Sequence, residues 1–244
     1  MLKIIGMTLE ELLNLNSDDV VRPLTADEVV YMAERVGAFW KYNYAVAKEK
    51  PGYHARLKSE WHSDGFIVSK ILLQFPNIKR IMANQIVLQL KAQGLSLPDY
   101  AGGIPDGATQ LGEDVAEILG VKKAEMRKEE GRIVLVTLIP PGSSLLLLED
   151  FCTKGTGFCE AVLFIKTAQP EVIIVPYEGV IINRGGLKSI EVEGVGSFEI
   201  ISVVDYRVND WPSDKCRLCL EFGSRPIKPK ETEENWRLIT TAQL

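Results

Sequence analysis

Apolar and polar positions in the first part of the chain predict helices. Residues 25–48 are expected to form one, because Thr25 is a good N-cap and Glu28 follows it at the spacing of a capping box. A Pro-Gly pair ends this stretch. Residues 77–91 are expected to form a second helix, with Gly94 after it as a stop. The apolar face of the second helix comprises Ile78, Ile81, Ile86, Leu88 and Leu90.

Farther along, the pattern changes to alternating strands and helices. Strands are expected at residues 100–103, 123–127, 132–139, 144–148 and 172–176, and helices at 106–119 and 156–167. The stretch 144–148 is almost purely apolar, as expected of a central strand buried on both faces. Strand, helix and strand in this order predict an α/β fold with a parallel sheet and right-handed crossovers.

Composition and charge narrow the class of protein. The formal net charge is -5 and the pI is about 5.3, whereas general nucleic-acid binding needs a basic surface. The longest apolar runs are far too short to span a bilayer. Glu10 and Glu11 interrupt the region where a signal peptide would be apolar. We therefore expect a cytoplasmic protein that does not bind nucleic acid or membranes.

Two acids, Glu149 and Asp150, directly follow the apolar strand at residues 144–148. Ligands of open parallel sheets bind outside the carboxyl ends of the strands, so this strand would deliver both carboxylates to the binding edge. An acidic pair can also simply end a strand and cap the next helix. The combination of four aliphatic residues, two acids and the loop that follows favours a binding site.

The loop after the acids has the composition of an anion-binding cradle. Gly155 and Gly157 allow a tight turn, and backbone N–H groups at a helix N-terminus bind anions. Thr153 and Thr156 add hydroxyl donors, while Lys154 either adds positive charge or points to solvent. Two carboxylates beside a phosphate cradle suit a phosphorylated sugar, with its hydroxyls and Mg²⁺ at the acids.

The segment from Glu149 to Gly157 resembles the 5-phosphoribosyl-1-pyrophosphate (PRPP) motif of type I phosphoribosyltransferases, and above all its variant in orotate phosphoribosyltransferases. Lys154 stands where a second threonine is usual, and Gly157 where Ser or Thr is common. The resemblance implies a parallel-sheet, Rossmann-like core that binds PRPP at residues 153–157. Glu149 and Asp150 would be catalytic residues at the ribose, and Mg²⁺ would arrive with PRPP and lie near Asp150.

Two further segments resemble the pyrophosphate-binding parts of these enzymes. Gly102 and Gly103 precede an expected helix, where paired glycines let an anion approach the backbone. Arg127 and Lys128 resemble an Arg-Lys-Glu strand end, which implies catalytic contacts to pyrophosphate, partly across a dimer interface. From the residues alone, the first segment is equally an ordinary strand-to-helix turn, and the second a solvated run of charges.

The chain departs from the family after Lys128. Orotate phosphoribosyltransferases carry a long mobile loop there, with a further lysine and usually a histidine, over the reacting sugar. This chain has only Glu130, Gly131 and Arg132 before the next expected strand, which predicts a hairpin. A closing loop excludes water and completes an active site, so a short hairpin weakens the case for full catalysis. Arg132 is the one basic residue left to substitute for the loop.

The resemblance also indicates residues that bind the base. Arg184 ends an expected strand and would recognise the carboxylate of orotate with its planar guanidinium. His62 matches a basic residue that helps to bind pyrophosphate, and Phe66 matches an aromatic residue near the base. Glu60 stands where the family usually has glycine. On chemistry alone, Arg184 also fits a surface turn, and a lone histidine is as often structural as functional.

The four cysteines are too few for a disulfide framework in a chain of 244 residues. Cys216 and Cys219 resemble a Cys-Pro-Leu-Cys tail in one subgroup of the family, and supply half of a tetrahedral zinc site. No second Cys-x-x-Cys and no histidine pair is evident to complete it. A metal held by Cys152 and Cys159 would obstruct the PRPP loop. We therefore expect no zinc and reduced, partly buried thiols.

Three consecutive regions are expected: an N-terminal helical and base-pocket region at 1–95, a PRPP-binding α/β core at 96–210, and a C-terminal tail at 211–244. The resemblance implies a homodimeric enzyme that joins orotate or a related base to PRPP and releases pyrophosphate. The alternative is a protein of the same fold that binds PRPP or a nucleotide without turnover, which the short hairpin favours. A purine-using transferase is disfavoured, because Arg184 suits a base with a carboxylate.

Overall fold

The computed structural model describes residues 2–244, which form two compact units. The first comprises the chain up to Tyr31 together with Leu72–Arg207, and the second comprises Met32–Ile71 together with Val208–Leu244. This division differs from the three consecutive regions expected from the sequence. The tail does not stand apart, because the strand at Arg225–Ile227 pairs with the strand at Tyr53–Arg56.

A six-stranded sheet forms the centre of the first unit. Its strand order is β11 (Ser189–Val192), β12 (Gly196–Asp205), β10 (Ile173–Asn183), β9 (Ser144–Cys152), β5 (Tyr100–Gly103) and β6 (Lys122–Lys123). All neighbouring strands are parallel except β11, which runs antiparallel to β12 at the edge. The predicted α/β fold with a parallel sheet is confirmed, and the four leucines of β9 are fully buried, as expected of a central strand.

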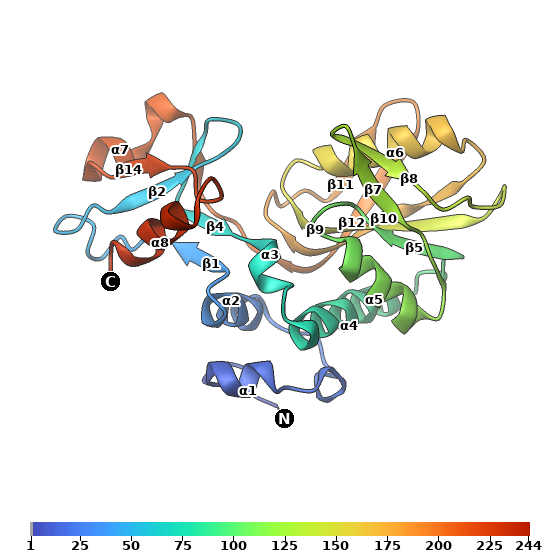
Figure 1. Cartoon of the computed structure of the whole chain (residues 1–244), viewed down its shortest axis with the longest axis horizontal. Helices are drawn as coiled ribbons and strands as arrows, with labels where there is room; N and C mark the ends of the chain where they lie inside the picture. Colours follow the sequence, from blue (N-terminus) through green and yellow to red (C-terminus); the bar gives the residue numbers. More distant parts are fainter. Residues whose placement is uncertain (1) are drawn as a thin grey trace. The chain divides into compact units, whose positions relative to one another are not determined.

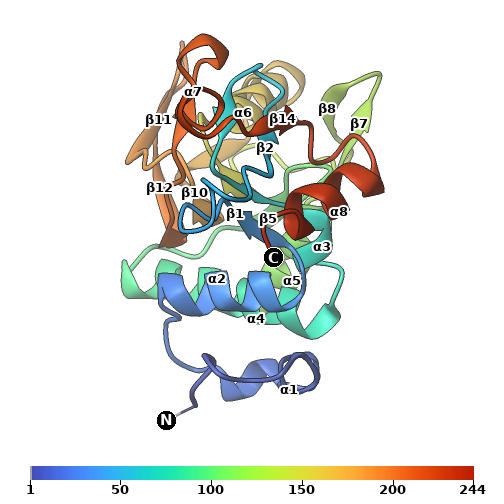
Figure 2. The same cartoon turned by 90° about the vertical axis from the view of Figure 1, so that its left-hand side faces the viewer.

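Helices cover both faces of this sheet. α4 (Pro76–Ala92) and α5 (Thr109–Leu119) pack together on one face, and α6 (Thr156–Ala168) covers the other (Figure 1). The short α1 (Leu9–Leu13) and η1 (Ser17–Asp19) lie on the side of α4 that faces away from the sheet (Figure 2). Within residues 2–244, no helix has the length and apolarity needed to cross a bilayer.

The hairpin predicted after Lys128 is present. β7 (Met126–Glu129) and β8 (Arg132–Leu135) pair antiparallel, and Glu129 stands opposite Arg132. Glu130 and Gly131 close the turn with φ angles of 49° and 82°. The two-residue turn explains why the hairpin is so short, since both positions adopt the left-handed conformation that such turns require.

The second unit contains a four-stranded sheet and a separate strand pair. The order in the sheet is β13 (Asp210–Trp211), β3 (His62–Ser63), β2 (Tyr53–Arg56) and β14 (Arg225–Ile227), and the pair joins β1 (Phe39–Lys41) to β4 (Gly65–Ile67). The helical elements are α3 (Ser69–Leu72, at the border between the units), η2 (Ser213–Lys215), α7 (Arg217–Phe222) and α8 (Glu233–Thr241). Two chain segments that are far apart in sequence thus build one small sheet.

The helix expected at residues 25–48 is half right. α2 (Ala26–Arg35) begins at the predicted capping box, in which the Glu28 N–H donates to Thr25 Oγ1 and the Thr25 N–H donates to the Glu28 carboxylate. The helix ends early because Gly37 takes a φ of 71°. The aromatic stretch that follows then pairs with β4 as a strand, so a long-range contact overrides the helical interpretation.

Candidate functional site

Strand β9 carries Glu149 and Asp150 to the carboxyl end of the parallel sheet. The preceding residue, Leu148, pairs with Gly103 at the end of β5, and Glu149 itself pairs with Val180 of β10. Both acidic side chains are half-buried, in contrast to the leucines before them. The strand therefore delivers two carboxylates to the edge of the sheet where ligands of this class of fold bind.

Two loops converge on this acidic pair, one on each carboxylate. Gly107, in the turn between β5 and α5, lies so close to Asp150 that a Cβ atom there would collide with the carboxylate. Gly157, in the first turn of α6, stands in the same relation to Glu149. The structure thus brings together three parts at one edge: the two acids, the turn at residues 104–108 (the glycine turn) and the predicted PRPP loop.

The loop at residues 153–157 leads directly into α6. Gly155 adopts a φ of 68° at the N-cap, and a Cβ atom there would lie 2.5 Å from the side chain of Ile190. The first N–H groups of a helix have no acceptor within it and carry the positive end of its dipole. Lys154 and Thr156 are exposed beside these groups, and Thr153 is half-buried. The arrangement suits a phosphate group.

The paired glycines Gly102 and Gly103 are buried, and their lack of side chains has a packing explanation. A Cβ atom on Gly102 would lie 2.5 Å from the backbone oxygen of Ala124, and one on Gly103 would overlap the backbone of Ala108. Gly103 thus lets the start of α5 pack closely against β5, and Gly102 leaves room for the neighbouring segment at Ala124. The part of this turn that faces solvent is Asp106 and its neighbour Gly107, which the sequence did not single out.

The basic residues of β7 are both exposed but have different partners. Lys128 Nζ lies 3.3 Å from Asp106 Oδ2, so its charge reaches the glycine turn. The Arg127 Nε–H donates to Glu129 Oε1 at 2.7 Å on the same strand. The structure therefore connects Lys128 to the predicted pyrophosphate turn, whereas Arg127 is turned toward the side of its own hairpin.

A buried acid that was not predicted from the sequence lies next to the site. Glu178 on β10 is fully buried, and it places a carboxylate oxygen within 4.8 Å of ligand atoms of Glu149 and Cys152. Burial raises the pKa of both glutamates, and the negative charge of Glu149 raises the pKa of Glu178 further. Burial also raises the pKa of Cys152 to about 12, so this cysteine is a thiol rather than a thiolate nucleophile.

The order of apolar and polar residues around Glu178 does not show that its side chain is buried. The pairing of β10 with β9 is irregular there, with a register shift between Ile174 and Glu178. An acid within an otherwise apolar strand was the one available hint. Because the two carboxyls are close together and Glu178 is fully buried, the pair favours a state in which a proton is retained.

Arg184 follows β10 at the same edge of the sheet. Its backbone N–H donates to the carbonyl oxygen of Cys152 at 2.7 Å, and the next residue, Gly185, packs against the backbone of Thr153. The side chain is half-buried, and its Nε and Nη2 atoms are shielded from solvent. The backbone of Arg184 therefore lies directly beside the start of the PRPP loop.

The structure contradicts the predicted role of His62. This residue belongs to the second unit, where it is 5% exposed and its Nδ1 atom lies 3.0 Å from His54 Nε2 and 3.4 Å from Cys219 Sγ. A ring nitrogen engaged in this way is not offered to pyrophosphate or a base. The match of position was misleading, because the sequence did not reveal how its neighbours in space would enclose it.

Phe66, also in the second unit, lines a pocket of about 480 Å³. Its ring centroid lies 6.3 Å from that of Trp236 and 5.7 Å from Lys230 Nζ. The remaining lining residues are largely basic or apolar: Arg56, Leu57, Lys58, Lys228, Pro229, Lys230 and Glu231. An aromatic ring surrounded by positive charge suits a flat, anionic ligand.

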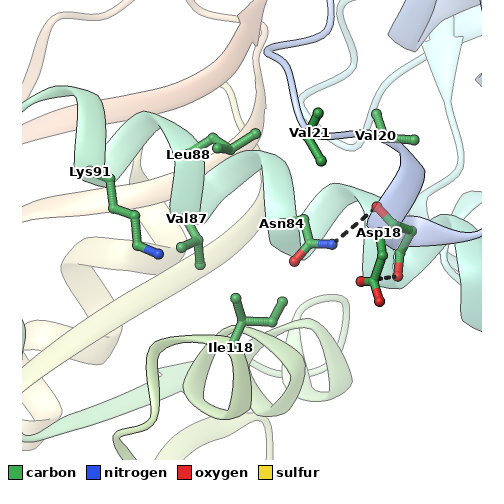
Figure 3. Close-up of a pocket in the computed structure, with 9 residues that line it drawn as sticks. Asp18, Val20, Val21, Asn84, Val87, Leu88, Lys91 and Ile118 are labelled. Atoms are coloured by element: carbon green, nitrogen blue, oxygen red, sulfur yellow. Dashed lines mark hydrogen bonds between the residues drawn. The ribbon is translucent and has the colours of Figure 1, made fainter. Parts of the chain in front are cut away.

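Another hollow, of about 260 Å³, lies in the first unit, and its lining does not combine an aromatic ring with several cations. It lies between η1, α4 and α5, where Val87 and Ile118 face it and Lys91 extends along its wall (Figure 3). The Asn84 side-chain amide donates to the carbonyl oxygen of Ser17 at 3.4 Å. None of the residues predicted to bind phosphate, sugar or base lines this hollow.

Comparison with known proteins agrees with the geometry. No family model matches the chain. The orotate phosphoribosyltransferase of Heliobacterium modesticaldum is 28% identical over 178 residues, which cover 72% of this chain and 88% of that protein. The orotate phosphoribosyltransferase of Acidithiobacillus ferrooxidans is 26% identical over 208 residues, covering 84% of this chain and 97% of that protein.

Solved structures show the same fold. UMP synthase of Leishmania donovani matches with a TM-score of 0.56 and 19% identity over 75% of this chain, which spans 37% of that larger protein. Orotate phosphoribosyltransferase of Aeropyrum pernix matches with a TM-score of 0.52 and 16% identity over 72% of this chain and 93% of its own length. The chain therefore has the fold of these solved structures and is similar in sequence to orotate phosphoribosyltransferases, with the acidic pair and phosphate loop at the expected edge of the sheet.

Proposed function

We propose that this chain transfers the 5-phosphoribosyl group of PRPP to orotate and releases pyrophosphate. The observation that carries the proposal is the position of the acidic pair between two loops. Asp150 lies against the glycine turn through Gly107, and Glu149 lies against the phosphate loop through Gly157. A sugar held at these carboxylates would have its 5-phosphate toward one loop and its pyrophosphate toward the other.

Each part of the edge then has a task. The N–H groups at residues 153–157 would bind the 5-phosphate, and the carboxylates of Glu149 and Asp150 would accept hydrogen bonds from the ribose hydroxyls. Lys128, which reaches the glycine turn at Asp106, would stabilise the pyrophosphate. Arg127 would have to leave Glu129 to add its charge there.

Mg²⁺ fits this proposal as part of the substrate complex. Asp106 and Asp150 offer the carboxylate oxygens that Mg²⁺ prefers, and PRPP itself supplies phosphate oxygens. A bound Mg²⁺ would neutralise charge on the pyrophosphate as it departs. The residues themselves act mainly by holding PRPP and the base in line for reaction.

The chemical step exchanges one bond at the anomeric carbon for another. A ring nitrogen of orotate attacks C1 of the ribose, the bond from C1 to the pyrophosphate oxygen breaks, and the electron pair leaves with pyrophosphate. The proton of the ring nitrogen passes to solvent or to the departing pyrophosphate. Positive charge that develops on the sugar is stabilised by the carboxylates beneath it.

Arg184 supports orotate as the base. Its backbone lies next to the phosphate loop, and a guanidinium forms paired hydrogen bonds with a carboxylate, which uracil and the purines lack. Within the second unit, the pocket around Phe66 combines an aromatic ring with several cations, which suits a flat, anionic ligand. Orotate phosphoribosyltransferases among the relatives agree with this choice of base.

A protein that binds PRPP without turnover is the second candidate. The hairpin of β7 and β8 favours it, because the two-residue turn at Glu130 and Gly131 leaves no long loop to exclude water. A base panel distinguishes the candidates. Pyrophosphate release is measured with Mg²⁺, PRPP and, in turn, orotate, uracil, adenine, guanine and hypoxanthine. Release with orotate alone supports the proposal, and release with a purine alone contradicts it.

We also propose that the active form is a homodimer. The family resemblance implies that basic residues such as Arg127 and Lys128 act partly across an interface, and two-fold dimers are the commonest oligomers. Light scattering at micromolar concentration should give a mass of twice the 27.2 kDa chain. A monomer at every concentration up to that of the activity assay would refute this part of the proposal.

A further inference from the structure

A compact group of metal-binding side chains lies in the second unit, whereas the residues assigned to PRPP belong to the first. It comprises His54 of β2, His62 of β3, Cys216 at the N-cap of α7 and Cys219 in the first turn of that helix. One ligand atom from each residue lies within 4.8 Å of the other three. No zinc was expected from the sequence, because no histidine pair was evident to complete the cysteine pair; that premise is wrong, since His54 and His62 lie beside both cysteines.

The distances within the group match those of a tetrahedral metal site. Zinc bonds of about 2.0–2.1 Å to nitrogen and about 2.3 Å to sulfur require about 3.3 Å between two nitrogens and about 3.6 Å between nitrogen and sulfur. The two histidine nitrogens are 3.0 Å apart. Cys216 Sγ lies 3.6 Å from His54 Nε2. Cys219 Sγ lies 3.5 Å from His54 Nε2 and 3.4 Å from His62 Nδ1.

A hydrogen bond at the ring nitrogen that faces away from the group fixes the orientation of His54. Its other nitrogen, Nδ1, lies 2.9 Å from Ser224 Oγ, and the Ser224 hydroxyl donates to the carbonyl oxygen of Gly52 at 3.3 Å. Since that hydroxyl proton is engaged, Ser224 Oγ accepts a hydrogen bond from the N–H at His54 Nδ1, which leaves the lone pair of the neutral ring on Nε2, directed at the group. Metal-bound histidines are held by such an outer hydrogen bond.

Burial and charge indicate the kind of metal. His54 and Cys216 are fully buried, His62 is 5% exposed, and Cys219 is partly buried, so the four ligands leave little access for solvent. Two thiolates and two neutral imidazoles balance the charge of a divalent cation, which makes burial of the ion favourable. A closed set of two sulfur and two nitrogen ligands is typical of structural zinc and leaves no open position for catalysis.

Simpler explanations account for part of the group only. A hydrogen bond between the two histidines explains their 3.0 Å separation but not why both sulfur atoms approach His54 Nε2, which has one lone pair. A disulfide between Cys216 and Cys219 would not explain why both histidine nitrogens lie close to the sulfur atoms. Both cysteines are also free thiols in the structure. One central ion explains all of the distances.

We propose that His54, His62, Cys216 and Cys219 hold a structural zinc ion that joins the two segments of the second unit. The histidines come from the first segment and the cysteines from the second, and His54 and Cys216 are 162 positions apart. At under about 80 residues the unit has the size at which natural domains add a metal or disulfides, because their apolar core is small. The two segments are already joined by the pairing of β2 with β14, and the ion would add a second link between them.

Metal analysis of the purified full-length chain tests the proposal. Mass spectrometry of the metals should find about one zinc per chain after dialysis, and less than about one tenth in the variant Cys216→Ser with Cys219→Ser. Cys159→Ser is the matched control, because it makes the same change at a partly buried cysteine of the first unit and should keep the wild-type zinc content. Zinc retained by the double variant would overturn the assignment.

A measurement on the wild type covers the case in which the double variant does not fold. Replacement of zinc by cobalt(II) should give the intense visible bands and sulfur-to-cobalt charge-transfer absorption of a tetrahedral site, and both should disappear when zinc is added back. Chelation should increase the number of thiols that react with a thiol reagent by two of the four cysteines. Absence of bound zinc after loading, or a weak octahedral cobalt spectrum, would refute the site.

Discussion

The ligand edge of the first unit and the histidine–cysteine group of the second unit are assembled in opposite ways. The edge takes most of its groups from one continuous stretch, since β9, the loop and α6 follow each other directly from Glu149 to Gly157. The histidine–cysteine group combines residues up to 165 positions apart. A continuous motif is visible in a sequence because a single supersecondary unit builds it, whereas a group that depends on tertiary pairing is not.

The difference also has a functional meaning. At the edge, side chains are half-buried or exposed, and backbone N–H groups and carboxylates are available to a ligand. In the second unit, the ligand atoms face one another and are largely shielded. An open set of groups suits a substrate that enters and leaves, and a closed set suits an ion that stays. Changes at the two places should therefore have separable effects.

Removal of both carboxylates at the edge should have the largest effect. In the variant Glu149→Gln with Asp150→Asn, the affinity for Mg²⁺-PRPP should fall at least about 100-fold, because each charge-assisted hydrogen bond contributes about 1.5–3 kcal/mol. Zinc content should be unchanged. Calorimetric titration measures the affinity, and metal analysis on the same sample measures the zinc.

Glu171→Gln is the control for this variant, because it makes the same change at an exposed position after α6. It should bind PRPP as the wild type does. An acidic-pair variant that folds and retains wild-type affinity would show that the edge is not the PRPP site.

Arg184 should have the next largest effect, on the base rather than on PRPP. Arg184→Ala should lower kcat/KM for orotate about 10- to 150-fold, the equivalent of one charge-assisted contact, with little change in PRPP affinity. Arg184→Lys should restore only part of the loss, since a point charge does not reproduce the planar fork of a guanidinium. Steady-state rates with orotate and uracil measure both effects. Full orotate activity in Arg184→Ala, or equal use of uracil by the wild type, would remove Arg184 from the base site.

The buried Glu178 should have a smaller effect, confined to stability. Because its pKa is raised by burial, the protonated form is favoured in the folded chain, and the stabilisation is complete below the ordinary pKa of about 4.3. As pH rises from there toward the raised pKa, the free energy of unfolding should fall by at most about 1.4 kcal/mol per pH unit. Glu178→Gln, which stays neutral, should lose this dependence.

Urea unfolding between about pH 5 and about pH 9 tests this expectation. The stability of the wild type should fall relative to that of Glu178→Gln as pH rises, whereas Glu171→Gln should follow the wild type. Parallel curves for Glu178→Gln and the wild type would mean that the buried carboxyl does not retain its proton.

Local signals predicted much of the first unit. The capping box at Thr25 and Glu28, the apolar strand before Glu149 and the glycine stop at Gly94 after α4 all act within a few residues, and each is present in the structure. β11 and β12 were not predicted, and the helix beyond Arg35 was predicted wrongly, because residues 39–41 pair there with the more distant strand β4. Local pattern carries no information about such pairing.

The same limit explains the errors at the candidate sites. The assignment of His62 rested on its position in a segment, yet its neighbours in space are His54 and Cys219. One signal for the zinc ligands was present in the sequence: both histidines of the chain lie eight positions apart, and a Cys-x-x-Cys occurs in the tail. Counting them together would have given a complete set of four ligands.

The edge around Glu149 and Asp150 is where we propose that phosphoribosyl groups are transferred to orotate. Phosphorus NMR of a single mixture of the chain, Mg²⁺, PRPP and orotate tests it most directly, because PRPP, pyrophosphate and the nucleotide product give separate signals. We expect PRPP to disappear as pyrophosphate and orotidine monophosphate appear in equal amounts. Nothing should change without orotate, and the variant Glu149→Gln with Asp150→Asn should be inactive. Tight binding of PRPP by the wild type with no product would contradict the claim and favour a protein that binds PRPP without turnover.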